Sequence, residues 1–165
     1  MQPKESLRSA ALSRRAAMSA AEREQAGIAL VAALRDLVQH AERVAAYVPF
    51  GSEPPITAIL GEREDILIPV LLPDNDLEWS TGDVLHGPDA IAGCDVVLVP
   101  ALAVDRHGNR LGRGGGSYDR ALRRATGVTI AVLYDGEWVE QLPAEAHDTR
   151  VGAVVMPSTG LVRLG

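Results

Sequence analysis

The sequence is poor in cysteine, lysine and aromatic residues. Cys94 is the only cysteine among 165 residues, so no internal disulfide can form, and a reducing cytoplasmic location is expected. Aromatic residues make up only 4% of the chain, so the core must consist mainly of aliphatic side chains. Of the 16 lysines and arginines, only Lys4 is a lysine, and any chemistry that needs an amine side chain must therefore use Lys4.

Two further absences limit the partners that the chain could bind. The net charge of −6 argues against binding nucleic acid or a membrane surface through bulk charge, although a local basic patch could hold a small anion. No apolar run is long enough to span a membrane, and the charged N-terminal segment does not resemble a secretory signal. The length and the 47% hydrophobic content predict one globular domain over residues 1–165, and the lack of an apolar heptad pattern favours a monomer.

Hydrophobic periodicity predicts strands that alternate with helices. A helix is expected over residues 4–18, and Ser19 with Glu22 forms a capping box that begins a second helix ending near His40. Strands are expected at residues 43–50, 65–73, 94–105, 128–136 and 152–158, with a polar edge strand at 76–83. A turn leading into a short helix is expected at 52–62, and a helix at 117–126. This order predicts an α/β fold, a single-domain three-layer sandwich around a mixed, mostly parallel sheet.

Polar segments follow several of these strands, at 48–53, 105–119 and 134–137. Ligands bind beyond the carboxyl ends of the strands in such sheets, so one site is expected where these segments meet.

The segment DRHGNRLGRGGGSYDRAL, residues 105–122, combines glycines with charged residues at the start of a helix. Glycines allow the backbone N–H groups to converge on an anion, and Arg110 and Arg113 could add bidentate contacts to phosphate oxygens. Asp119 could hold Mg²⁺ against those phosphates. The spacing fits neither the Walker A loop nor the dinucleotide-binding fingerprint, so a flexible connection with solvated charges stays open as an alternative.

Four separated segments resemble the 5-formyltetrahydrofolate cyclo-ligase family, also called 5,10-methenyltetrahydrofolate synthetase. The glycine-rich segment looks like the family's Gly-x-Arg-Leu-Gly-x-Gly-x-Gly-Tyr-Tyr-Asp run. The N-terminal KESLR is similar to a Lys-x-x-x-Arg opening, YVPFGSEPPI to a Tyr-x-x-x-x-x-Glu segment, and LPAEAHD to a Pro-x-x-x-x-Asp segment. The likeness covers nearly the whole chain and implies an architecture related to sugar-phosphate isomerases and CoA transferases.

The resemblance implies an ATP- and Mg²⁺-dependent reaction on 5-formyltetrahydrofolate. The formyl oxygen attacks the γ-phosphate of ATP, nitrogen 10 closes on the formyl carbon, and phosphate leaves to give the 5,10-methenyl product. The resemblance places ATP at Lys4, Arg8, Arg110, Leu111, Gly112, Arg113, Gly114, Gly115, Gly116, Ser117 and Tyr118, with Lys4 and Arg113 as catalytic residues. It places the folate at Val48, Phe50, Glu53 and residues 113–117, and Mg²⁺ at Asp119 and Asp148.

Three features depart from the family pattern. Ser117 stands where the family usually has an aromatic residue, the stretch LHGPDAIAGCD is shorter than usual, and Glu137 stands where many members have glutamine. Two other readings therefore stay open, a non-catalytic nucleotide- or folate-binding module and a phosphate-binding isomerase or transferase on a related fold.

Overall fold

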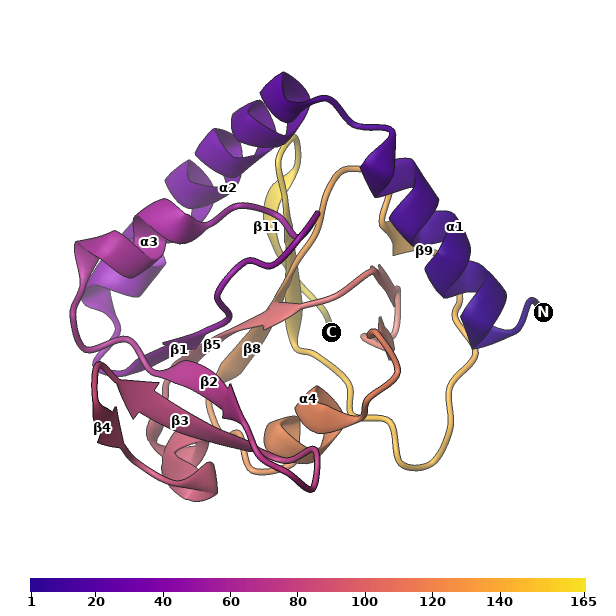
Figure 1. The fold of residues 1–165 in the computed structure, drawn as a ribbon. Helices are drawn as coiled ribbons and strands as arrows, with labels where there is room; N and C mark the ends of the chain where they lie inside the picture. The colour runs from indigo at the N-terminus through magenta and orange to yellow at the C-terminus, as the bar shows by residue number, and fades with distance from the viewer.

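The computed structural model describes residues 1–165 and contains a five-stranded sheet flanked by helices (Figure 1). The helices are α1 (Lys4–Ala16), α2 (Ala20–His40), α3 (Thr57–Glu62) and α4 (Ser117–Leu122), with a 3-10 helix η1 (Pro88–Gly93). The strands are β1 (Val44–Ala46), β2 (Ile68–Leu71), β3 (Leu77–Thr81), β4 (Val84–Leu85), β5 (Val96–Pro100), β6 (Ala103–Asp105), β7 (Arg110–Leu111), β8 (Val128–Val132), β9 (Trp138–Val139), β10 (Ala153–Met156) and β11 (Gly160–Arg163). None of the helices combines the length and apolar character that a membrane span requires.

The central sheet has the strand order β1-β5-β8-β10-β11. The first four strands are parallel to one another, and only β11 is antiparallel to its neighbour β10. Two smaller sheets, β2-β3-β4 and β7-β6-β9, complete the structure. The predicted α/β fold with a mostly parallel central sheet is confirmed.

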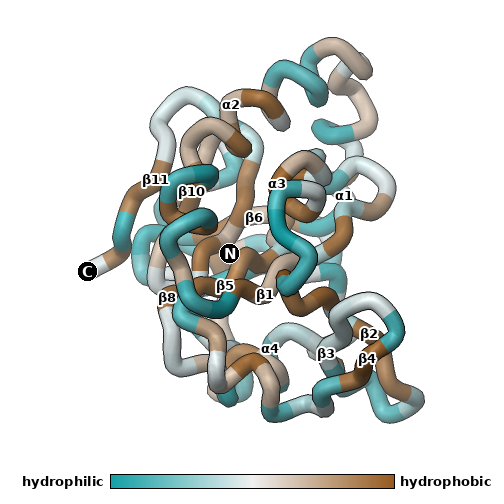
Figure 2. Tube along the Cα trace, turned by 90° about the vertical axis from the view of Figure 1, so that its left-hand side faces the viewer, coloured by the Kyte–Doolittle hydropathy of each residue, from teal (hydrophilic) through white to brown (hydrophobic).

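The central strands bury both of their faces, because successive side chains of a strand point to opposite sides. On β5, Val96 and Leu98 pack with α2 and α3, whereas Val97 and Val99 pack with β3, η1 and α4. Figure 2 shows the hydrophobic residues concentrated in these central strands. The three layers are therefore two helices, the sheet, and an outer layer that mixes a small antiparallel sheet with short helices.

The predicted strand over residues 94–105 is wrong as one continuous element. The chain forms β5 up to Pro100 and then enters a different sheet as β6. The carbonyls of Pro100 and Ala101 accept hydrogen bonds from the guanidinium groups of Arg110 and Arg15, at 3.0 and 2.6 Å. At this point the backbone carbonyls are bonded by arginine side chains and not by a neighbouring strand, and the central strand ends.

Three other expectations also differ from the structure. The predicted strand 65–73 forms β2, which pairs with β3 in an antiparallel hairpin. The turn of this hairpin contains Asn75, with φ of 68°. The segment reaches the central sheet only through one bridge between Ala45 and Leu67. The helix predicted over 117–126 ends at Leu122. The sequence analysis also missed β11, which closes the edge of the central sheet.

The two N-terminal helices begin and dock differently. The capping box of α2 is confirmed, since Ser19 Oγ accepts from the Glu22 amide at 3.1 Å and Glu22 accepts from the Ser19 amide at 3.0 Å. Helix α1 lies apart from the central sheet (Figure 1) and packs through Ala11 against Leu102 and Leu111 near β6 and β7.

An arginine clamp joins the β2–β3 hairpin to the segment that follows α4. Arg124 donates two hydrogen bonds to the Asp76 carboxylate, at 2.8 and 2.7 Å, and the Leu77 amide donates a third at 2.8 Å. The hydrogen bonds from Arg124 are the main reason that the pKa of Asp76 falls from 3.8 to about 2. The clamp fixes the hairpin beside the glycine-rich segment.

Replacing Asp76 tests the clamp. Because the folded pKa of Asp76 is depressed, its stabilisation is present above about pH 3.8 and is lost as the pH falls towards about 2. We expect Asp76→Asn to lower the free energy of unfolding by about 1 kcal/mol near neutral pH, since solvent screens part of this interaction. Urea denaturation of both proteins across this pH range measures the difference, with Asp83→Asn in the exposed β3–β4 turn as the control. Equal stability of wild type and Asp76→Asn near neutral pH would contradict the assignment.

Candidate functional site

A cavity of about 370 Å³ lies beyond the carboxyl ends of β1 and β5. Pro100 is the last residue of β5, and Glu53 lies on the loop that follows β1. This is the edge of the sheet at which the sequence predicts a site. The cavity is lined by Lys4, Arg8, Arg15, Glu53, Leu71, Leu77, Pro100, Ala101, Leu102, Arg110, Leu111, Gly112, Arg113, Gly114, Gly115, Gly116, Ser117, Tyr118, Asp119, His147 and Asp148.

The glycine-rich loop lets arginine side chains lie directly against its backbone. A Cβ atom on Gly112 would come within 2.8 Å of Arg110 Nη1, and one on Gly114 would come within 3.3 Å of Arg8 Cζ. Gly114 also has φ of 106° and Gly116 has φ of 77°, conformations that favour glycine. The glycines are therefore required for close approach as well as for backbone geometry.

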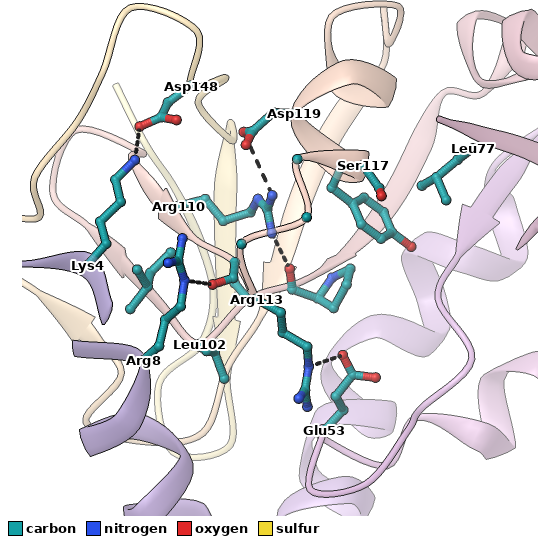
Figure 3. A pocket seen from close by; sticks show the side chains of 18 of the residues that line it. Lys4, Arg8, Glu53, Leu77, Leu102, Arg110, Arg113, Ser117, Asp119 and Asp148 are labelled. Carbon is teal, nitrogen blue, oxygen red and sulfur yellow. Dashed lines mark hydrogen bonds and ion pairs between the residues drawn. The ribbon is translucent and has the colours of Figure 1, made fainter. Parts of the chain in front are cut away.

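Five lysine and arginine side chains line the cavity, and the four labelled in Figure 3 come from two distant segments of the chain. Lys4 and Arg8 come from α1, whereas Arg110 and Arg113 come from the glycine-rich loop. Arg8 Nε donates to the carbonyl of Gly112 at 2.8 Å, which ties α1 to the loop.

Each of the other three cations lies beside a carboxylate that also lines the cavity. Lys4 Nζ is 2.8 Å from Asp148 Oδ2. The Arg110–Asp119 and Arg113–Glu53 pairs are looser, at 3.8 and 3.9 Å. The three carboxylates therefore offset part of the positive charge of the four cations.

The Lys4–Asp148 pair keeps both of its groups charged. Burial by itself lowers the pKa of Lys4, but the hydrogen bond and the charges of Asp148 and Glu145 outweigh it, and the pKa of Lys4 is raised. Burial likewise raises the pKa of Asp148, but the hydrogen bonds from Lys4 and the Glu145 amide outweigh it, and the pKa of Asp148 is lowered. The tight contact is thus an ion pair.

The Arg110 guanidinium is the most enclosed of the four cations. Burial lowers the pKa of Arg110, although a guanidinium stays protonated at any physiological pH. Its Nη1 donates to the Pro100 carbonyl, while its buried Nε–H has no hydrogen-bond partner. An enclosed cation that lines a cavity is suited to binding an anion there.

The opposite side of the cavity is apolar. Leu71 and Leu77 of the β2–β3 hairpin line it together with Tyr118, whose ring meets the edge of Trp79 at a centroid distance of 6.5 Å. The buried Tyr118 hydroxyl has no partner, and burial raises the pKa of Tyr118. One end of the cavity is therefore suited to a polyanion and the other to a flat, largely apolar group.

The model of the 5-formyltetrahydrofolate cyclo-ligase family matches residues 1–157. The chain belongs to the 5-formyltetrahydrofolate cyclo-ligase family. A relative with that enzyme name from Mycolicibacterium smegmatis is 40% identical over 98% of this chain and 97% of its own length.

Solved structures show the same fold. The 5,10-methenyltetrahydrofolate synthetase of Aquifex aeolicus is 26% identical and superposes with a TM-score of 0.82, over 98% of this chain and 92% of that chain. A 5,10-methenyltetrahydrofolate synthetase of Mycoplasma pneumoniae is 21% identical with a TM-score of 0.76, over 93% and 98% of the two chains. The fold of a cyclo-ligase thus covers essentially the whole of this protein.

The cavity gathers every residue that the family resemblance assigns, with two exceptions. Val48 and Phe50 do not line it, and both side chains are largely exposed. Phe50 stays near the rim, because its amide donates to Glu53 Oε1 at 2.8 Å and its ring lies 5.9 Å from Arg113 Cζ. These two residues therefore lie outside the cavity, and their assignment to the folate stays a prediction.

Several lining residues were missed by the sequence analysis. Leu71 and Leu77 flank the hairpin turn, and Arg15, Leu102 and His147 also line the cavity. The only signal for Arg15 in the sequence is its spacing of seven residues from Arg8, which places both residues on one helix face. Nothing local marks Leu71 and Leu77 as lining residues, because their hairpin meets the cavity only in the tertiary structure.

The two aspartates assigned to the metal lie near each other. Thr149, the residue after Asp148, donates its amide to Asp119 Oδ1 at 3.2 Å and its hydroxyl to the Asp119 carbonyl at 3.0 Å. No cluster of three or more histidine, cysteine, aspartate or glutamate residues is present. Magnesium commonly takes one or two carboxylates together with waters and substrate phosphates, so this pair fits Mg²⁺ as a partner of a bound phosphate chain.

Replacing Gly114 tests the cradle. Gly114→Ala should strain the backbone at its positive φ and push the Arg8 guanidinium away, so anion binding should weaken. We expect a smaller rise in melting temperature on addition of inorganic tripolyphosphate than for the wild type. Gly115→Ala is the matched control, because its Cβ would meet only Ser117 Oγ at an ordinary 3.8 Å. Equal responses of the two variants would argue against a cradle at Gly114.

Proposed function

We propose that the protein catalyses the ATP- and Mg²⁺-dependent cyclisation of 5-formyltetrahydrofolate to 5,10-methenyltetrahydrofolate, with release of ADP and phosphate. One observation carries the proposal beyond family membership. A single cavity joins a glycine-lined cluster of cations, two neighbouring aspartates and an apolar wall with a carboxylate at its edge. The cyclisation requires sites for a phosphate chain, a metal ion and a pterin within reach of one another.

The chemistry requires that a poor leaving group be activated. The formyl oxygen forms a bond to the γ-phosphorus as the bond to the ADP oxygen breaks, so the formyl carbon becomes an imidate-like phosphate. Nitrogen 10 then adds to that carbon and loses its proton, and the C–O bond breaks to release phosphate. Phosphoryl transfer of this kind depends mainly on positioning and on neutralising charge.

The cations supply that neutralisation. In the proposal, Lys4 and Arg8 contact the triphosphate from α1, while the loop arginines Arg110 and Arg113 contact it from the other side, together with backbone groups of residues 111–118. Their contacts to phosphate oxygens are charge-assisted and, for the arginines, bidentate. Arg113 is 3.9 Å from Glu53. In the proposal, Arg113 therefore acts between the phosphate end and the folate end, where the phosphoryl group is transferred.

Asp119 and Asp148 would hold Mg²⁺, which supplies charge neutralisation between neighbouring phosphate oxygens. Both aspartates are paired with cations of the same cavity. With a metal ion and a phosphate chain bound, Asp119 and Asp148 would serve as metal ligands, and Lys4 and Arg110 would be available to contact phosphate oxygens. Each charge would then still have a partner.

The folate occupies the other end of the cavity in this proposal. Glu53 accepts hydrogen bonds from the pterin, and Leu77 and Tyr118 pack against the ring system. Ser117 adds no aromatic surface there. Phe50 and Val48 contact the part of the folate that extends out of the cavity, in keeping with their exposure.

The test is direct. Purified protein with ATP, Mg²⁺ and saturating 5-formyltetrahydrofolate should form the methenyl chromophore, and ADP should appear in equal amount. Leaving out ATP or chelating the metal should stop the reaction. Binding of ATP and folate without turnover would overturn the proposal and favour a binding module. Turnover of a sugar phosphate or a CoA ester instead would favour the isomerase or transferase alternative.

Lys4→Ala tests whether α1 reaches the nucleotide. Its loss should raise the KM for ATP by roughly ten- to a hundredfold, since a charge-assisted contact contributes roughly 1.5–3 kcal/mol. The KM for 5-formyltetrahydrofolate should change little, because Lys4 lies at the opposite end of the cavity from Leu77 (Figure 3). Arg14→Ala, an equal charge change at an exposed position of the same helix, is the control. An unchanged KM for ATP in Lys4→Ala would show that the helix does not contact ATP.

A further inference from the structure

The inward face of α1 is cationic rather than apolar. Lys4, Arg8, Ala11 and Arg15 follow one another at spacings of four, three and four residues, which places them on one face of the helix. Lys4, Arg8 and Arg15 line the cavity, and Ala11 and Arg15 are the only buried residues of the helix. The face that meets the rest of the protein is therefore the face that carries the cations.

Apolar packing alone gives this helix little orientation. Ala11 is its only fully buried apolar side chain, and Leu7 and Leu12 are only partly buried against the same small cluster. The stabilisation from packing scales with the apolar area that is buried, and an alanine contributes little of it. A methyl group also has no directional contact that could prevent the helix from tilting.

Arg15 supplies the directional contact. Its side chain is 2% exposed and the Glu137 side chain is 5% exposed. Arg15 Nε and Nη2 donate to the two Glu137 oxygens, each at 2.9 Å, and Nη2 also donates to the Ala101 carbonyl at 2.6 Å. The Tyr134 amide holds Glu137 Oε1 at 2.8 Å, so the carboxylate cannot rotate freely.

This anchor acts at the same point of the fold as the glycine-rich loop. Arg15 binds the carbonyl of Ala101, and Arg110 binds the carbonyl of Pro100, the preceding residue. Helix α1 and the loop are thus both attached to the end of β5. Their four cations can surround one ligand only if both attachments are kept.

We propose that the buried Arg15–Glu137 pair is a positioning device that holds α1 at the angle from which Lys4 and Arg8 meet the phosphates. This inference rests on the proposed function, since it assigns the ligand of α1 as the phosphate chain of ATP. Eleven residues separate Arg15 from Lys4, a distance of about 16 Å along the helix. A tilt of about 4° at Arg15 therefore displaces Lys4 by about 1 Å, enough to weaken a positioned contact strongly.

The variants separate positioning from folding. Removing one partner leaves a buried charge unpaired and destabilises a protein. The main variant is therefore the double change Arg15→Met with Glu137→Met, which keeps the buried volume and removes the directional hydrogen bonds. Glu137→Gln retains one of the two contacts to Arg15 and should give an intermediate result. Arg35→Met with Glu62→Met is the matched control, because that ion pair joins α2 to α3 near the surface at 2.8 Å.

Three measurements decide the matter. In the double methionine variant, calorimetry should show MgATP binding weakened by about tenfold or more. The KM for ATP should rise by a similar factor, while the KM for 5-formyltetrahydrofolate stays close to that of the wild type. Hydrogen exchange should quicken in the amides of α1 and not in the central sheet. The surface control should leave all three unchanged.

The outcomes are distinguishable from those of the proposed function. Calorimetry needs no turnover, so a wild-type protein that binds MgATP without cyclising folate would overturn the reaction and leave the positioning test valid. Wild-type affinity for MgATP in the double variant would overturn the positioning role. So would an equal rise of both KM values, which indicates a general structural defect, or unchanged exchange in α1.

Discussion

The carbonyl groups of Pro100 and Ala101, at the carboxyl end of β5, organise the site. A strand in the middle of a parallel sheet presents its last carbonyls towards the ligand side, and here two arginine side chains take them. These contacts end the central strand, direct the chain into a second sheet, and hold the glycine-rich loop and α1 at one place. The position of the cavity follows from them, because both of its cationic walls are attached there.

Internal charge pairing is the second constraint on the site. A cluster of four cations in a small cavity repels itself unless anions lie close by, and three carboxylates meet that need at 2.8 to 3.9 Å. In the proposed reaction the same carboxylates would act as metal and folate ligands. The protein without ligands holds them as ion pairs with cations of the cavity, and bound phosphates and metal would provide these groups with new partners.

Much of this could be predicted from local sequence. The aliphatic runs indicated the strands of a mostly parallel sheet, the Ser19–Glu22 box began α2 as expected, and the glycine-rich segment marked one wall of the cavity. These signals work because turns, caps and hydrophobic periods act over a few residues. Lys4, Glu53 and Asp148 were found only through resemblance to a family, since an isolated charge in a loop or a terminal helix has no local pattern that reveals its role.

The sequence by itself determined which residues are apolar, where the glycines allow close approach, and that Lys4 is the only lysine. Only the tertiary structure decided that Arg15 and Arg110 take consecutive carbonyls, that Leu71 and Leu77 form the apolar wall, and that Val48 and Phe50 lie outside the cavity. Arg15 and Glu137 are 122 residues apart. No period or spacing encodes such a pair, because its partners meet only after the sheet has set the distance between their segments.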